Sequence, residues 1–113
     1  MSWQNLEPLF GKEGSQAVDY LWRMKAYKEW PRSVREIYNN CNRPCSRTKF
    51  KRILDWLVEE KVLGREEIPG RGGKKYRYWP LYDRKVTVEV KVREVITKMQ
   101  DIALWEGVDL GDD

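Results

Sequence analysis

Residues 46–61, SRTKFKRILDWLVEEK, form the most strongly patterned segment of the chain. Ser46 stands where a side-chain oxygen can cap the first turn of a helix. On a helical wheel the apolar side chains that follow lie within one narrow arc, and Lys61 lies in the same arc at the end of the segment. They are Phe50, Ile53, Leu54 and Leu57. The pattern predicts an amphipathic helix over about 46–61 with its apolar face in a core.

The outward residues of this helix carry charge in an unusual order. Its last turns are acidic, at Asp55 and Glu59, whereas the outward residues of its first turns are basic or hydroxylic. The helix dipole favours the opposite order, with acids at the N-terminus. A DNA backbone or base edge facing that end would account for the order. The residues concerned are Arg47, Thr48, Lys49, Lys51 and Arg52.

Two further helices are expected before this one. Ser15 is a candidate cap for a helix that runs to about Trp30, where Pro31 stops it. Ser33 then begins SVREIYNN, and Glu36 lies three residues on, at the spacing of a capping box. The turn CNRPC separates this short helix from the next, because its proline prevents a continuous helix.

A glycine-rich stretch, IPGRGGKKYRYWP, follows the third helix, and its spacing can be compared with that of nucleotide-binding loops. A Walker loop would need a glycine at Ile68 and a Ser or Thr at Lys75, and a dinucleotide loop would need its third glycine at Lys75. Both loops also open a helix, whereas this one leads into an aromatic segment that favours a strand. The segment VLGREEI before it is a second strand candidate. A β-hairpin with a glycine tip is therefore predicted.

The composition excludes several classes of protein. With 113 residues the chain is large enough for one domain with its own core. It has no membrane-length apolar run and no signal-peptide pattern at its start, so a cytoplasmic location is expected. Histidine is absent, and Cys41 and Cys45 alone cannot complete a zinc site. Neither a metal nor a cofactor is expected. The sequence also has no recognisable acid–base pair, so the protein is not expected to be an enzyme.

Positive charge is concentrated in the middle of the chain. The net charge is zero over residues 1–30, +7 over 31–82 and −3 over 83–113. A basic segment of this kind indicates a surface for a polyanion. A solvated surface without a partner is the alternative reading of the charge alone.

The order of helix, short helix, turn, basic-ended helix and glycine-tipped hairpin resembles that of winged helix-turn-helix transcription regulators. TKFKRILDWLVEEKVLGREEIPGRGGKKYRYWPL is similar to the recognition helix and wing of the broad group with ArsR-, MarR- and PadR-like repressors. The resemblance covers about 33–81 and selects no subfamily. It implies a mainly α fold with a small β-hairpin, and double-stranded DNA as the partner. The cysteine–histidine set of metal-sensing repressors is absent, so metal sensing is not implied.

The resemblance also implies how DNA would be held. The third helix would enter the major groove with its first residues at the base edges, and the hairpin tip would be a wing in the minor groove. Arg47, Thr48, Lys51 and Arg52 would then face bases, with Arg43 and Lys49 on phosphates. Arg71 would enter the minor groove, and Lys74 and Lys75 would contact flanking phosphates.

The C-terminal third carries a separate signal. Five apolar residues at alternating spacings of four and three form a short heptad seam, although VTVEVKV also alternates as a strand would. We expect a helix that joins two copies in a homodimer. Its seam residues are Val88, Val92, Val95, Met99 and Ile102.

The expected organisation is a winged-helix domain over 1–83 with its core in 15–82. A dimerisation helix over 84–105 and an acidic tail over 106–113 follow. A winged helix that serves as a protein–protein adaptor in a transcription or replication assembly is the alternative. It would require the basic end of the third helix to be buried against a partner.

Overall fold

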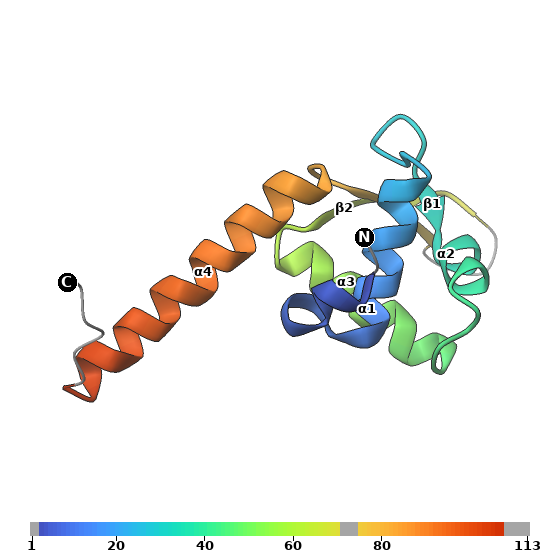
Figure 1. The fold of residues 1–113 in the computed structure, drawn as a ribbon. Helices are drawn as coiled ribbons and strands as arrows, with labels where there is room; N and C mark the ends of the chain where they lie inside the picture. The colour runs from blue at the N-terminus through green and yellow to red at the C-terminus, as the bar shows by residue number, and fades with distance from the viewer. Residues whose placement is uncertain (1–2, 71–74, 108–113) are drawn as a thin grey trace. The chain divides into compact units, whose positions relative to one another are not determined.

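The computed structural model describes residues 3–70 and 75–107, and it is mainly helical with a small antiparallel sheet (Figure 1). A short 3-10 helix, η1 (Trp3–Leu6), precedes the first α-helix. The elements that follow are α1 (Glu7–Arg23), β1 (Arg32–Ser33), α2 (Val34–Asn40), α3 (Arg47–Glu59), β2 (Leu63–Ile68), β3 (Lys75–Pro80) and α4 (Arg84–Trp105).

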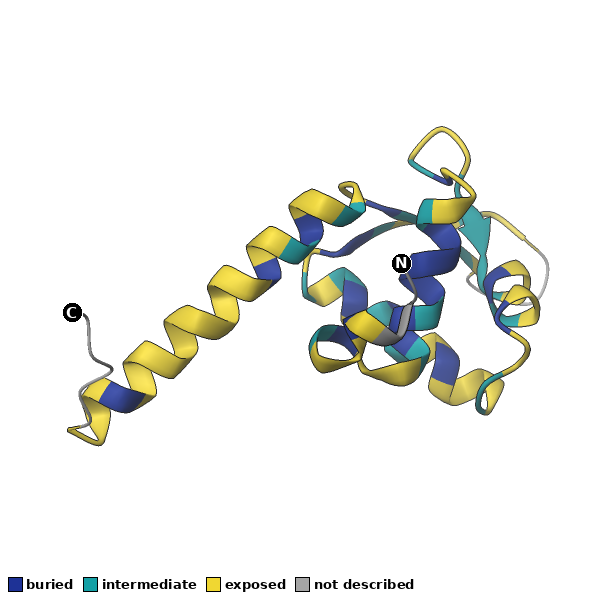
Figure 2. Cartoon of the chain, viewed as in Figure 1, coloured by how far each residue is buried: buried dark blue, intermediate teal, exposed yellow. Residues whose placement is uncertain are grey.

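The chain divides into two compact units, Met1–Asp83 and Arg84–Asp113. The first contains every element up to β3, and the second contains α4. In α4 the structure shows the helical alternative for VTVEVKV rather than the strand. Most of α4 is exposed (Figure 2).

The prediction of a first helix from Ser15 to about Trp30 was wrong at both ends. α1 begins at Glu7 and continues through a kink at Gly11, where φ is 74° and ψ is 173°. Ser15 therefore lies inside the helix, and its hydroxyl donates to the Gly11 carbonyl at 2.5 Å. At the other end, Lys25 has a φ of 51°, which breaks the helix before Pro31 is reached.

The three helices α1, α2 and α3 end with the same hydrogen-bond pattern. After α3, Lys61 N–H donates to Val58 O at 3.1 Å, and Val62 N–H donates to Leu57 O at 3.0 Å. This pair of bonds is the Schellman motif, which needs a left-handed residue just beyond the helix. Here no glycine fills that position. It is occupied by Lys25, Asn42 and Lys61, with φ values of 51°, 61° and 63°.

The serine caps predicted for the second and third helices are confirmed. The Ser33 side chain accepts from the Glu36 N–H, and the Ser46 side chain accepts from the Lys49 N–H, each at 3.2 Å. The second half of the capping box does not form, because the Glu36 carboxylate binds Arg32 at 3.2 Å instead.

The sheet has the order β1-β3-β2, with one more strand than the predicted hairpin. β2 and β3 are antiparallel, and β1 pairs with the other edge of β3 through Arg32 with Tyr78 and Ser33 with Arg77. In β2, Gly64 lies opposite Trp79, and a Cβ built on Gly64 would come within 2.6 Å of the indole ring. The Trp79 ring thus occupies the space that a side chain at Gly64 would need.

The core of the first unit lies where α1, α3 and the sheet meet (Figure 2). α1 packs against α2, α3 and β3, and α3 packs against β2. The predicted apolar stripe of the third helix is confirmed at three positions, because Phe50, Leu54 and Leu57 are fully buried. Other fully buried side chains are Val18, Leu21, Ile37, Val62 and Tyr78.

Candidate nucleic-acid interface

The buried stripe of α3 fixes which side chains its first turns expose. With Phe50 and Leu54 inward, the polar residues between Ser46 and Leu54 point away from the core. All five that the sequence singled out are exposed: Arg47, Thr48, Lys49, Lys51 and Arg52. The basic end of α3 is therefore not covered by any part of the chain that the structure describes.

Two of these five residues are ion-paired, on opposite flanks of the helix. Lys49 reaches Glu13 of α1 at 3.5 Å, and Lys51 reaches Asp55 one turn along α3 at 2.8 Å. Such exposed pairs contribute little to stability, so a stronger anion can compete for either lysine. By contrast, Arg47, Thr48 and Arg52 make no side-chain hydrogen bond or ion pair with the described residues.

Asp55 links α3 to the hairpin. Besides Lys51, its carboxylate accepts from Arg65 of β2 at 2.8 Å and from the Tyr78 hydroxyl of β3 at 2.6 Å. Burial raises the pKa of Asp55, but the hydrogen bonds from Lys51, Tyr78 and Arg65 outweigh it and leave the pKa below its usual value. Burial also raises the pKa of Tyr78, and its bond to Asp55 adds to this shift. Both groups thus keep the protonation states that the contact needs.

The aromatic residues of β3 serve mainly to hold the hairpin. Tyr78 is fully buried under α3, and Trp79 covers Gly64 on the next strand. The Tyr76 ring lies near two cations, with Arg65 Cζ at 4.5 Å and Lys51 Nζ at 5.4 Å from its centre. These contacts fix β3 beside the exposed end of α3.

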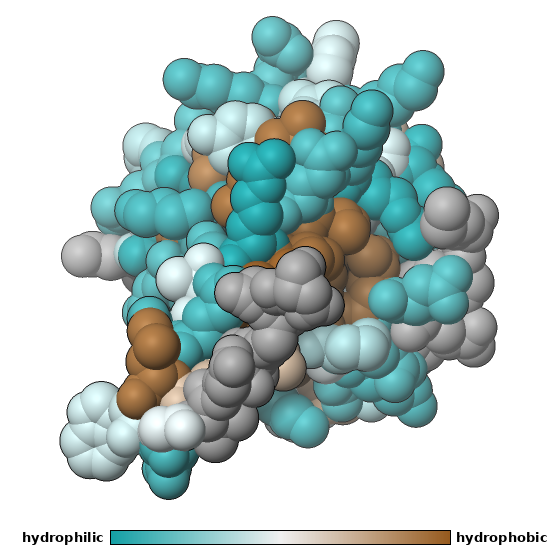
Figure 3. Space-filling view, turned by 60° about the vertical axis from the view of Figure 1, so that its left-hand side comes forward, coloured by the Kyte–Doolittle hydropathy of each residue, from teal (hydrophilic) through white to brown (hydrophobic). Residues whose placement is uncertain are grey.

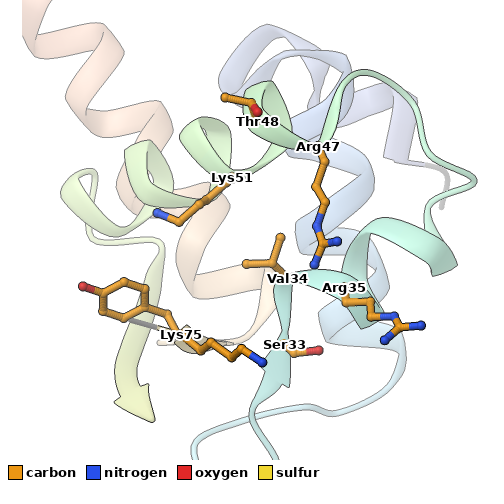
Figure 4. Close-up of a pocket in the computed structure, with 8 residues that line it drawn as sticks. Ser33, Val34, Arg35, Arg47, Thr48, Lys51 and Lys75 are labelled. Atoms are coloured by element: carbon orange, nitrogen blue, oxygen red, sulfur yellow. The ribbon is translucent and has the colours of Figure 1, made fainter. Parts of the chain in front are cut away.

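A cavity of about 540 Å³ opens where α2, α3 and β3 meet (Figure 4). Four of its eight lining residues are cationic and none is acidic. In Figure 4, Arg47 points from α3 toward α2, and Lys75 extends along the other side toward Ser33. The lining residues are Ser33, Val34, Arg35, Arg47, Thr48, Lys51, Lys75 and Tyr76.

The structure brings only part of the predicted set into this cavity. Lys75 lines it from β3. Arg43 lies in the connection between α2 and α3, where its guanidinium donates to the Asn39 side chain at 3.2 Å. The predicted wing contacts Arg71 and Lys74 lie outside the described residues.

Sequence reasoning missed Arg35 and Ser33. Ser33 caps α2 and Arg35 lies in its first turn, and no role at the site was predicted for this helix from the sequence. The two-residue strand β1 brings this helix start beside β3, since Ser33 pairs with Arg77. An exposed arginine in the first turn of a serine-capped helix was the available signal, but only the sheet shows what lies opposite it.

The seam predicted on α4 is largely exposed. The exposed fractions are 41% for Val92, 44% for Val95, 58% for Met99 and 63% for Ile102, and Val88 is half-buried. Figure 3 shows one face of the molecule, which is mainly hydrophilic with separate hydrophobic areas. An apolar stripe of this length on an exposed helix is typical of an association surface.

The two cysteines are free thiols. Burial raises the pKa of Cys41 to about 11, with Arg23 lowering it and Asp19 raising it slightly. Cys45 is less buried, and burial raises its pKa too. A raised pKa keeps a thiol protonated and therefore slow to react.

The described residues contain no group of three or more side chains suited to hold a metal ion. Nor does any helix among them combine the length and apolar character needed to cross a membrane. No protein-family model matches the chain, and a comparison with curated proteins finds no significant similarity.

Proposed function

We propose that the protein is a sequence-specific regulator of transcription that binds double-stranded DNA as a winged helix-turn-helix. The observation that carries the proposal is the exposed basic end of α3. Arg47 and Arg52 are held outward there with no acidic partner among the described residues. The order α1-β1-α2-α3-β2-β3 and the sheet order β1-β3-β2 support the fold assignment.

In this proposal α3 lies in the major groove. Arg47, Thr48 and Arg52 read base edges, since a guanidinium can pair with guanine through two hydrogen bonds. Lys51 stays near its Asp55 partner and borders the groove. Arg43, Lys49, Lys75 and the wing residues Arg71 and Lys74 supply contacts to the backbone and the minor groove.

Salt dependence is the direct test of phosphate contacts. Affinity for a duplex selected from a random pool should fall steeply with salt, with a log–log slope of several units. Arg52→Ala should relax the sequence preference, whereas Lys75→Ala should weaken all sequences about equally. Both substitutions remove one positive charge from an exposed side chain, so each is the control for the other. A response that is flat with salt would favour the protein–protein adaptor.

We also propose that the protein is a homodimer joined through α4. Two copies related by a two-fold axis would read half-sites about 34 Å apart. Val95 lies on the seam and Val90 lies on the other side of α4, yet both are 44% exposed. Val95→Glu should therefore dissociate the dimer, because it buries an unpaired charge, whereas Val90→Glu should not.

Sedimentation at micromolar concentration measures both variants. A monomeric unmodified protein, or equal dissociation by the two substitutions, would contradict the assignment of the seam. Circular dichroism checks that each variant remains folded.

A further inference from the structure

The cavity between α2, α3 and β3 gathers positive charge that the described chain does not neutralise. Of its four cations, Lys51 is paired with Asp55. Arg35, Arg47 and Lys75 form no ion pair with any described carboxylate. Like charges that line one opening repel each other, and an anion bound among them reduces that repulsion.

The remaining walls indicate what kind of anion fits. Val34 and the Tyr76 ring supply apolar surface, and the volume of about 540 Å³ exceeds what a bare phosphate needs. The Ser33 oxygen accepts from the Glu36 amide, so its own O–H can still donate to an acceptor. A phosphate with a sugar attached satisfies both the cationic and the apolar walls.

We propose that this cavity holds one phosphate of a DNA strand together with its sugar, with Arg35 and Lys75 as the phosphate ligands. The inference rests on the proposed function and assigns to the start of α2 a contact with DNA. Arg35 comes from α2 and Lys75 from β3, so the two approach the cavity from different elements. Arg47 borders the same cavity from α3.

This arrangement has a consequence for register. A phosphate held between α2 and β3 is fixed with respect to Arg47 and Thr48, which line the cavity beside it. The contact therefore positions α3 on the duplex without reading sequence itself. It acts at one phosphate, unlike a diffuse basic surface.

Single methylphosphonate linkages test this contact, because each replaces a charged phosphate oxygen by a methyl group. The probe is a duplex selected from a random pool by the unmodified protein, with one linkage changed at a time. We expect about tenfold weaker binding at one or two adjacent linkages, the loss that one charge-assisted hydrogen bond supplies. Arg35→Ala should cause a similar loss on the unmodified duplex.

The decisive measurement combines the two changes. In the Arg35→Ala variant, the methylphosphonate at the sensitive linkage should weaken binding by no more than about twofold further, because the arginine that contacts this phosphate is already absent. Lys75→Ala should show the same coupling. Lys28→Ala, an exposed cation outside the cavity, should leave the full methylphosphonate effect in place.

The outcomes separate this inference from the proposed function. A pool that yields no bound duplex overturns both. If a duplex binds tightly but the loss of affinity from Arg35→Ala multiplies with the loss from every methylphosphonate, only the cavity contact is overturned. Thermal melting of Arg35→Ala and Lys75→Ala confirms that the variants are folded when binding is measured.

Discussion

Replacing Gly64 by alanine should destabilise the sheet because of one neighbour, Trp79. The two residues are directly opposite in the β2–β3 register. A Cβ on Gly64 would lie 2.6 Å from Cε2 and 2.7 Å from Cζ2 and Nε1 of the indole. Atoms in contact normally lie about 3.5–4.0 Å apart, so the rigid ring would have to move by about 1 Å.

The magnitude follows from two opposing effects. Overpacking of this kind costs about 1–3 kcal/mol. Gly64 does not have a positive φ, so alanine is compatible with its backbone and stabilises by about 0.4–1 kcal/mol through the unfolded chain. A net loss of about 1–2 kcal/mol is expected, which lowers Tm by about 5–15 °C.

The assay is thermal and urea unfolding, followed by circular dichroism, in a double-mutant cycle with Trp79→Val. On its own Trp79→Val is also destabilising, because it removes buried aromatic surface. In that background, however, Gly64→Ala should be neutral or stabilising, since the clash is gone while the effect on the unfolded chain remains. If Gly64→Ala raised Tm with Trp79 intact, or lost equal stability in both backgrounds, the packing of the indole over Gly64 would be refuted.

Three other outcomes are expected. Asp55 has a lowered pKa, so its contribution is present above the unfolded pKa of about 3.9 and is lost as pH falls through the folded value. Asp55→Asn should therefore cost about 1–2 kcal/mol at pH 7 in urea unfolding and should weaken the loss of stability in acid. Lys61→Gly should raise stability by about 0.5–1 kcal/mol, because φ is 63° there; a lower Tm would contradict this. At pH 8, Cys41 should react with iodoacetamide far more slowly in the folded protein than in urea, as mass spectrometry can measure, and equal rates would refute the effect of burial.

Local signals were enough to predict the elements nearest the candidate site. Ser33 and Ser46 cap α2 and α3 as expected, because the cap depends on a side chain and an amide only three residues apart. The inward face of α3 followed from periodicity alone. The glycine-tipped connection separates two strands, as predicted, although its central residues lie outside the described ones.

The wrong or missing predictions depended on contacts distant in sequence or on competing local geometry. Serine is a residue type that commonly caps helices, but α1 already begins at Glu7. The Ser15 hydroxyl therefore donates a hydrogen bond to the Gly11 carbonyl. β1 is two residues long, too short for any alternating pattern, and exists only through its pairing with β3. The link from Asp55 to Lys51 was readable from the helical spacing, but its bond to Tyr78 requires the hairpin register.

The place of β1 in the sheet has a consequence for how the chain folds. Its pairing with β3 closes a loop that contains all of α2 and α3, whereas β2 and β3 meet across a short connection. Closing the longer loop costs more chain entropy, and only two residue pairs offset that cost. The hairpin should therefore form early and β1 should join late, after the chain has been synthesised through β3. The start of α2 is then the last part of the basic cavity to reach its place during folding, and the first to leave it when the domain opens locally.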